Sequence, residues 1–404
     1  MAGYTLRARQ LLTMSDAFPS SDLEAARVGL IEDGCVVSRG GTITWVGPWS
    51  ERPSHADELP MSRAEVALPA LVECHTHSLF AGARYEEFAV RNAGGSYAEI
   101  LESGGGILST MAATRAADEQ LLEALLRERM EAFATQGCAL VEVKTGYGLS
   151  HDEELRQLRL LERVRKSLPV ELVVTYLGAH AIPPEYRANR EAYVQEICQR
   201  TIPVIVAEEL ADAIDVFCDR GAFTAEESHR ILRTGRDAGL EVRIHTDELS
   251  TSGGCQVASA LGAKSADHLE YATDQDLDAL AKADVAAVLL PAVTGFLAMP
   301  PRPRARDMAA RGIRLALSTD YNPGSAHCQN LLLMATLGCT LYKMTPGEAL
   351  RALTRVPAEV LGKENRFGQI AAGYDARIVT AALPSWRALP YDMAPPEPLG
   401  RIGF

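Results

Sequence analysis

The residues with the clearest chemical potential in this sequence are histidines, and they are not scattered evenly. Five of the nine histidines end apolar, β-branched runs, and an aspartate ends the last such run. These six residues are His75, His77, His180, His245, His268 and Asp320. Imidazole nitrogen and carboxylate oxygen together suit zinc or iron. A set with few protein ligands leaves a position open for water, so the pattern indicates a catalytic rather than a closed structural metal site.

The closest pair in the sequence is His75-Thr76-His77. Side chains two residues apart on a strand face the same side, so both imidazoles can reach one ion. A two-metal version of this chemistry needs a bridging group, usually a modified lysine on the fourth strand. The fourth apolar run, DAIDVFCD, has no lysine, and Lys144 ends the second run instead. We therefore predict one metal, with Lys144 as a structural residue behind the ligands.

A carboxylate follows one of these histidines closely. Glu248 lies three residues after His245, in the segment HTDE. A carboxylate at this spacing can carry a proton between an activated water and a leaving nitrogen. The alternative is a solvated loop acid. We favour the proton-transfer role.

Such residues need a scaffold that brings distant segments to one place, and the middle of the chain predicts one. Eight apolar runs, each ending in polar residues, begin at Ala67, Cys138, Val170, Asp212, Leu240, Lys264, Ala283 and Gly312. Segments with helical spacing lie between them, such as DEQLLEALLRERMEAFATQG. Apolar strands that alternate with helices are typical of a buried parallel sheet. Eight units predict a (β/α)8 TIM-type barrel, whose active site lies at the carboxyl ends of the strands; an open doubly wound sheet is the alternative.

Both ends of the chain differ from the middle in their sequence pattern. The segments IEDGCVVSRGG and TITWVG near the start and FGQIAAGYDARIVTAAL near the end predict short strands with glycine-rich turns. We expect residues 1–65 and 366–404 to form one small β-sandwich domain and residues 66–365 to form the barrel. Two unrelated tails are the alternative.

Composition excludes several classes of function. The formal net charge is -13, so the surface repels nucleic acid and anionic membranes. None of the eight cysteines forms a C-x-x-C pair, and we expect reduced thiols in a cytoplasmic protein. The first residues lack the apolar run of a signal peptide, and no stretch approaches the length of a membrane span.

Taken together, the motifs resemble those of the amidohydrolase superfamily, and within it those of the imidazolonepropionase family. The superfamily marks are His75-x-His77, the segment HTDE, the segment DHLE and Asp320. The family marks are GGSYAEILESGGGILSTMAATRAA, VEVKTGYGL, YLGAHAIP and STDYNPGS. The resemblance covers nearly the whole chain.

The resemblance implies roles for individual residues. It implies His75, His77, His245 and Asp320 as ligands of one zinc or iron ion per subunit. It implies substrate contacts from Arg84, Tyr97, Tyr147, His180, Glu248, Asn322, Gly324 and Ser325. It implies His268, with Glu248 and Asp320, as catalytic. A guanidinium pairs bidentately with a carboxylate, which makes Arg84 the candidate for the acidic tail of a substrate.

The activity implied is hydrolysis of the cyclic amide of 4-imidazolone-5-propanoate to N-formimino-L-glutamate, a step of histidine degradation, with His180 steering the ring carbonyl. The partner is this small molecule, and a homodimer is expected. A deaminase or another cyclic-amide hydrolase on the same scaffold stays open, because HTDE and DHLE also fit a cytosine-type deaminase. A non-catalytic barrel is the least favoured reading, since all four ligands are intact.

Overall fold

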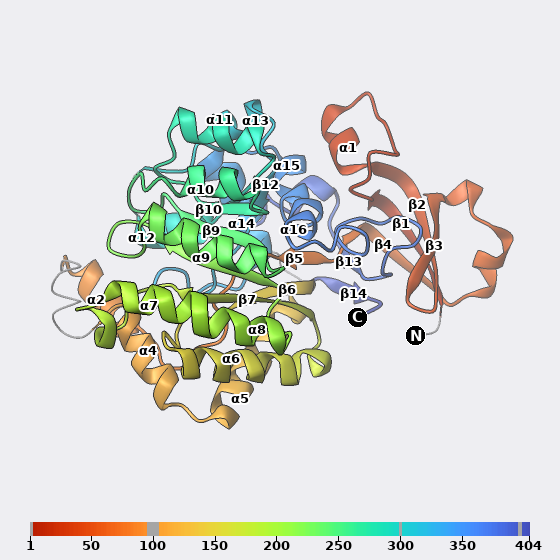
Figure 1. The fold of residues 1–404 in the computed structure, drawn as a ribbon. Helices are drawn as coiled ribbons and strands as arrows, with labels where there is room; N and C mark the ends of the chain where they lie inside the picture. Colours follow the sequence, from red (N-terminus) through yellow and green to blue (C-terminus); the bar gives the residue numbers. More distant parts are fainter. Residues whose placement is uncertain (1–2, 95–104, 299–300, 395–397) are drawn as a thin grey trace.

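Two sheets organise the protein (Figure 1). The structure is a computed structural model, and it describes residues 3–94, 105–298, 301–394 and 398–404. One sheet has eight strands and the other has six. No helix among these described residues is long and apolar enough to cross a membrane.

The eight-stranded sheet is parallel throughout, and its strands follow one another in chain order. Its strands are β5 (Leu71–Glu73), β6 (Cys138–Lys144), β7 (Glu171–Ala179), β8 (Ala213–Cys218), β9 (Glu241–Thr246), β10 (Ser265–His268), β11 (Ala286–Leu289) and β12 (Leu315–Leu317). An open doubly wound sheet reverses its strand order at a switch point. Because this order never reverses, the predicted barrel is confirmed and the doubly wound alternative is wrong.

The first and last strands meet just beyond their carboxyl ends. The backbone N–H of Asp320 donates to the carbonyl of His75 at 3.1 Å, and the N–H of His77 donates to the carbonyl of Tyr321 at 3.0 Å. Inside this junction, buried Glu73 accepts hydrogen bonds from the Ser318 hydroxyl and from backbone N–H groups. The junction of the sheet therefore falls on the residues that the sequence singles out for chemistry.

Helices cover the outside of this sheet (Figure 1). They are α2 (Tyr85–Asn92), α4 (Ile107–Ala116), α5 (Glu119–Thr135), α6 (His151–Val164), α7 (Arg190–Glu196), a π-helical turn (Ile197–Thr201), α8 (Ile202–Ala207), α9 (Ala225–Asp237), α10 (Gly254–Leu261), α11 (Asp274–Lys282), α12 (Pro291–Leu297), α13 (Ala305–Ala310), α14 (Leu331–Tyr342), α15 (Pro346–Arg351) and α16 (Arg355–Val360). The helix predicted from DEQLLEALLRERMEAFATQG is α5, capped by the Asp118 side chain and buried along Leu122, Leu126 and Met130.

Both termini contribute to the six-stranded sheet. Its order is β14 (Gly400–Ile402), β13 (Ile378–Ala381), β4 (Met61–Pro69), β1 (Tyr4–Leu12), β2 (Leu30–Arg39) and β3 (Thr42–Pro48). Short helix α1 (Leu23–Val28) packs against α15. One small β-sandwich domain from both ends was expected, and the structure shows a single six-stranded sheet built from both ends, so the alternative of two unrelated tails is wrong. Because β4 stays in this sheet as far as Pro69, the chain enters the barrel only at Leu71; the domain limits given above stay a prediction.

Candidate active site

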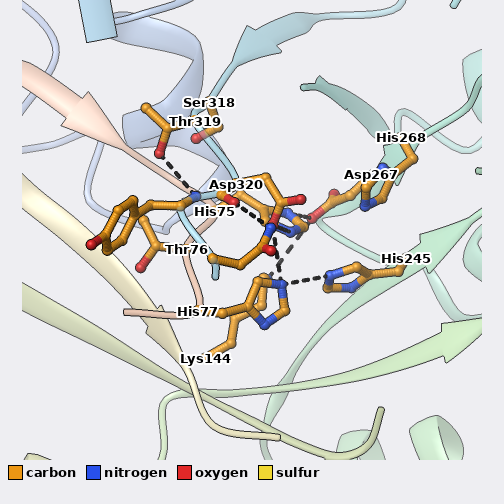
Figure 2. Close-up of polar contacts among 12 residues, drawn as sticks. His75, Thr76, His77, Lys144, His245, Asp267, His268, Ser318, Thr319 and Asp320 are labelled. Atoms are coloured by element: carbon orange, nitrogen blue, oxygen red, sulfur yellow. Dashed lines mark hydrogen bonds and ion pairs between the residues drawn. The ribbon is translucent and has the colours of Figure 1, made fainter. Parts of the chain in front are cut away.

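Five of the six chemically marked residues lie together at the carboxyl ends of the barrel strands (Figure 2). His75 and His77 follow β5, His245 lies on β9, His268 ends β10, and Asp320 follows β12. The most exposed of these five side chains retains only about 4% of its surface. Residues from four strands thus share one buried centre.

Four of these side chains point donor atoms at one another. Asp320 Oδ1 lies 3.2 Å from His77 Nε2 and 3.4 Å from His75 Nε2. His245 Nε2 lies 3.3 Å from His77 Nε2. Tetrahedral ligands at about 2.1 Å from a metal stand about 3.4 Å from each other. These three separations are close to that value. His75, His77 and Asp320 form one group whose ligand atoms lie within 4.8 Å of one another, and His75, His245 and His268 form a second.

Unsatisfied atoms at this centre also fit a cation. His75 Nε2 and Asp320 Oδ1 are buried and have no hydrogen-bond partner in the part of the chain that the structure describes. Buried polar atoms are rarely left without one, because each costs about 1–3 kcal/mol. Burial, the positive charge of Lys144 and the neighbouring His245 lower the pKa of His75 to about 3, so it is in the neutral form that binds metals. The donor set thus fits a divalent metal ion.

Two aspartates hold the far nitrogens of these imidazoles. His75 Nδ1 lies 2.6 Å from Asp267 Oδ2, and His245 Nδ1 lies 2.9 Å from Asp215 Oδ2. A carboxylate on one ring nitrogen sets the tautomer and turns the other toward the metal. The sequence analysis did not assign either aspartate. Their signal was present, since Asp267 precedes His268 in DHLE and Asp215 lies inside DAIDVFCD.

Lys144 lies behind these aspartates. Its Nζ is 2.7 Å from Glu142 and 2.9 Å from Asp215, and all three side chains are buried. Burial alone lowers the pKa of Lys144, but Asp215 and Glu142 more than offset this and raise it overall. A protonated, fully paired ammonium is a poor candidate for a modified, metal-bridging lysine, which supports the prediction that it is structural.

The backbone near the centre adopts left-handed conformations in non-glycine residues. The φ angles are 81° at His268, 56° at Asp247 and 50° at Asp320. Such conformations cost about 1–3 kcal/mol each and persist where surrounding contacts enforce them. At the ends of these three barrel strands the backbone is therefore locally strained, and this strained conformation sets the direction of the side chains.

His180 and Tyr147 line the same centre from the neighbouring strands. The His180 ring stacks on His77 with centroids 4.9 Å apart, and its Nδ1 lies 3.0 Å from the carbonyl of Gly146. Burial lowers the pKa of His180 well below its ordinary range, so the ring is neutral. Nδ1 then carries the proton, and Nε2 is an acceptor. In this tautomer Nε2 can accept a hydrogen bond from an N–H group, and the role of His180 toward a substrate stays a prediction.

Glu248 lies beside His268 rather than in solvent. Its side chain is 14% exposed, and Oε2 is 3.8 Å from His268 Nε2. Burial, with Glu270 and Asp320 nearby, raises the pKa of Glu248 well above its ordinary range. A solvated loop acid does not describe this environment. A buried acid whose pKa is raised is suited to protonating a leaving group.

The loop at residues 322–325 and Arg84 meet beside this centre. Asn322 Oδ1 accepts from the N–H groups of Gly324 and Ser325 at 2.7 and 2.8 Å, and its amide donates to the carbonyl of Asp320. The Arg84 guanidinium lies against Gly324 so closely that any Cβ there would overlap it. Arg84 also pairs with Glu87 at 2.8 Å. Tyr97 lies outside the described residues.

Comparisons with known proteins identify the family of the chain. Residues 66–397 match the model of the amidohydrolase family, which is the class that the barrel and its His/Asp centre define. Imidazolonepropionase from Shewanella baltica is 42% identical over 355 residues, which are 87% of this chain and 87% of that protein. Imidazolonepropionase from Shewanella oneidensis is 40% identical over 92% of each chain. The crystal structure of A. niger ochratoxinase matches with a TM-score of 0.68 at 17% identity, covering 95% of this chain and 90% of its own, and shows the shared fold.

The chain therefore belongs to the amidohydrolase family and, within it, to the imidazolonepropionases.

Proposed function

We propose that this enzyme hydrolyses the ring amide of 4-imidazolone-5-propanoate to N-formimino-L-glutamate, the activity named for its relatives. The observation that carries the proposal is the buried cluster of His75, His77, His245 and Asp320, in which three pairs of ligand atoms lie 3.2, 3.3 and 3.4 Å apart. A fold alone does not imply an activity, because one barrel hosts many chemistries. The reaction is therefore argued from the side chains around the centre.

His75, His77, His245 and Asp320 would hold one divalent ion. When bound, such an ion polarises a water molecule and lowers its pKa from about 16 toward neutrality. Zinc and iron both suit three imidazoles and one carboxylate. Elemental analysis of the purified protein tests this: one zinc or iron per chain supports it, and two metals per chain would contradict it.

The remaining residues handle the substrate and its protons. Asp320 and His268 accept the proton of the attacking water, whose oxygen bonds to the ring carbonyl carbon. The ring C–N bond then breaks, and Glu248, whose pKa is raised by burial, gives a proton to the departing nitrogen. His180 Nε2 accepts a hydrogen bond from a ring N–H and so orients the ring.

The propanoate tail of the substrate needs a cation in a protein of net charge -13. Arg84 supplies it from beside the loop at residues 322–325, with Tyr147, Asn322, Gly324 and Ser325 forming the neighbouring wall. Tyr97 is retained as a substrate contact on the resemblance alone. Glu87 already occupies one edge of the guanidinium, so the tail would pair with the other edge.

The test is purified enzyme with 4-imidazolone-5-propanoate and cytosine side by side. Release of N-formimino-L-glutamate supports the proposal, whereas turnover of cytosine alone would identify a deaminase. We also propose a homodimer, which sedimentation tests, and a cytoplasmic location, which cell fractionation tests. All eight cysteines are free thiols, as that compartment allows.

A further inference from the structure

Glu248 has no side-chain anchor of its own. Among the residues that the structure describes, no hydrogen bond reaches its carboxylate, and its nearest charged partner is His268, at 3.8 Å. A proton carrier must nevertheless be held within a fraction of an ångström of its target. The position of Glu248 is therefore set by its backbone, and what fixes that backbone decides where the carboxyl group lies.

One buried carboxylate, that of Asp219, accepts hydrogen bonds from the backbone around Glu248. Asp219 follows β8 and is 4% exposed. Its Oδ2 accepts from the N–H groups of Glu248 at 2.8 Å and Leu249 at 2.9 Å. Its Oδ1 accepts from the Ser250 hydroxyl and from the Arg220 N–H, each at 2.6 Å. Three consecutive residues of the loop after β9 are thus tied to the end of the neighbouring strand.

The turn that contains Glu248 is held together by a second carboxylate, that of Asp247. Asp247 takes a left-handed φ of 56°, and its carboxylate accepts from the Ser252 N–H at 2.6 Å and from Cys255 Sγ at 2.9 Å. These contacts secure the turn at residues 247–255 but do not touch the Glu248 backbone. Asp219 is the side chain that does.

We infer that Asp219 is a positioning residue for Glu248, holding the loop so that the Glu248 carboxyl faces His268 and the reacting ring. The inference rests on the proposed role of Glu248 in proton transfer. Asp219 neither reaches the four proposed metal ligands in any described contact nor contacts the wall proposed for the propanoate tail. Its loss is therefore expected to lower kcat while leaving metal content and KM nearly unchanged.

The test compares Asp219→Asn with Asp212→Asn. Asparagine keeps the shape at 219 but removes the charge from all four contacts, and its amide NH2 cannot accept from a backbone N–H, so at least one of the four contacts fails. We expect kcat to fall by about 10- to 100-fold, the cost of a misplaced catalytic group. Asp212 precedes β8 at its other end and accepts from the Val174 N–H at 2.8 Å. Its variant is a matched control that should keep wild-type kcat.

A double variant separates positioning from general stability. If Asp219 acts through Glu248, then Asp219→Asn combined with Glu248→Gln should have the kcat of Glu248→Gln within about twofold, because contacting residues that act as a unit are not additive. A kcat equal to the product of the two single effects would assign Asp219 to the fold and overturn the inference. An unchanged kcat in Asp219→Asn would do the same.

Amide hydrogen exchange tests the inference without turnover. Peptides covering residues 246–252 should exchange faster in Asp219→Asn than in the wild type or in Asp212→Asn. If Asp219→Asn does not fold, Ser250→Ala removes one of the four contacts, and the same peptides should still exchange faster. Unchanged exchange in the folded variant overturns the inference. Wild-type enzyme inactive on 4-imidazolone-5-propanoate would instead overturn the proposed function and leave the exchange result standing.

Discussion

Substitution of Asp267 tests directly how much the hydrogen bond to His75 contributes to metal affinity. Its Oδ2 lies 2.6 Å from His75 Nδ1 and 3.9 Å from Lys144 Nζ, so its main partner is the proposed ligand. Asp267→Asn keeps an oxygen that can accept from the imidazole but removes the charge. Asp267→Ala removes the acceptor altogether and lets the ring turn.

The magnitude follows from the kind of hydrogen bond lost. A bond to a charged group contributes about 1.5–3 kcal/mol and a neutral one about 0.5–1.5 kcal/mol. The charge alone is therefore worth about 1.4 kcal/mol, or a factor of about 10 in metal affinity. Full loss of the acceptor should reach about 100-fold, the upper end for residues that orient metal-bound histidines. We expect Asp267→Asn to weaken metal binding about 10-fold and Asp267→Ala about 100-fold.

The assay is titration of metal-free protein with zinc against a chelator of known affinity, with thermal unfolding measured in parallel. Asp276→Asn, which alters a helix-capping carboxylate away from the site, serves as the control and should bind zinc as the wild type does. Wild-type zinc affinity in folded Asp267→Ala would refute the reasoning, since the orientation of His75 would then not depend on this carboxylate.

Three further predictions address the other parts of the site. His245→Ala should abolish turnover and lose most of the metal, because neighbouring water cannot restore the shell; elemental analysis showing a full complement would rule it out as a ligand. Glu248→Gln should keep its metal while kcat falls by about 10²–10⁴-fold, and an unaltered kcat would remove it from proton transfer. Arg84→Met should raise KM strongly and lower kcat/KM by at least about 10-fold, with metal content unchanged. The control Arg127→Met breaks a surface pair with Glu123 and should leave both kinetic constants unchanged. Normal substrate binding in Arg84→Met would show that Arg84 serves only in its ion pair with Glu87.

Local patterns in the chain were enough to predict the barrel and the residues at its mouth. Buried strands such as β6 read as continuous apolar runs, because both faces are covered. The same runs end in polar residues, and the carboxyl ends of parallel strands share one edge. His75 and His77 were paired from two-residue periodicity alone. Each of these inferences depends on short segments, whose meaning does not change with the rest of the fold.

Other features depend on partners far apart in the sequence, and no local pattern contains them. Asp267 meets His75 across 192 positions, and Asp215 could be recognised as a support for His245 only once β8 and β9 were side by side. The Arg84 guanidinium pairs with Glu87 because α2 begins immediately after Arg84 and brings the two side chains together. The sequence alone could not decide between this ion pair and a pairing of Arg84 with substrate. The hydrogen bond from His180 to the Gly146 carbonyl likewise decides which ring nitrogen is an acceptor.

The amino-acid sequence by itself thus determined the element order, the barrel and the identity of the strand-end donors, because hydrophobic periodicity and residue chemistry are local properties. Tertiary structure alone decided which carboxylate orients which imidazole, that Lys144 neutralises buried acids behind the centre, and that Asp219 holds the loop of Glu248. The physical reason is that hydrogen bonds and ion pairs act over a few ångströms in space. Chain separation carries no information about those distances until the strands have closed around the site.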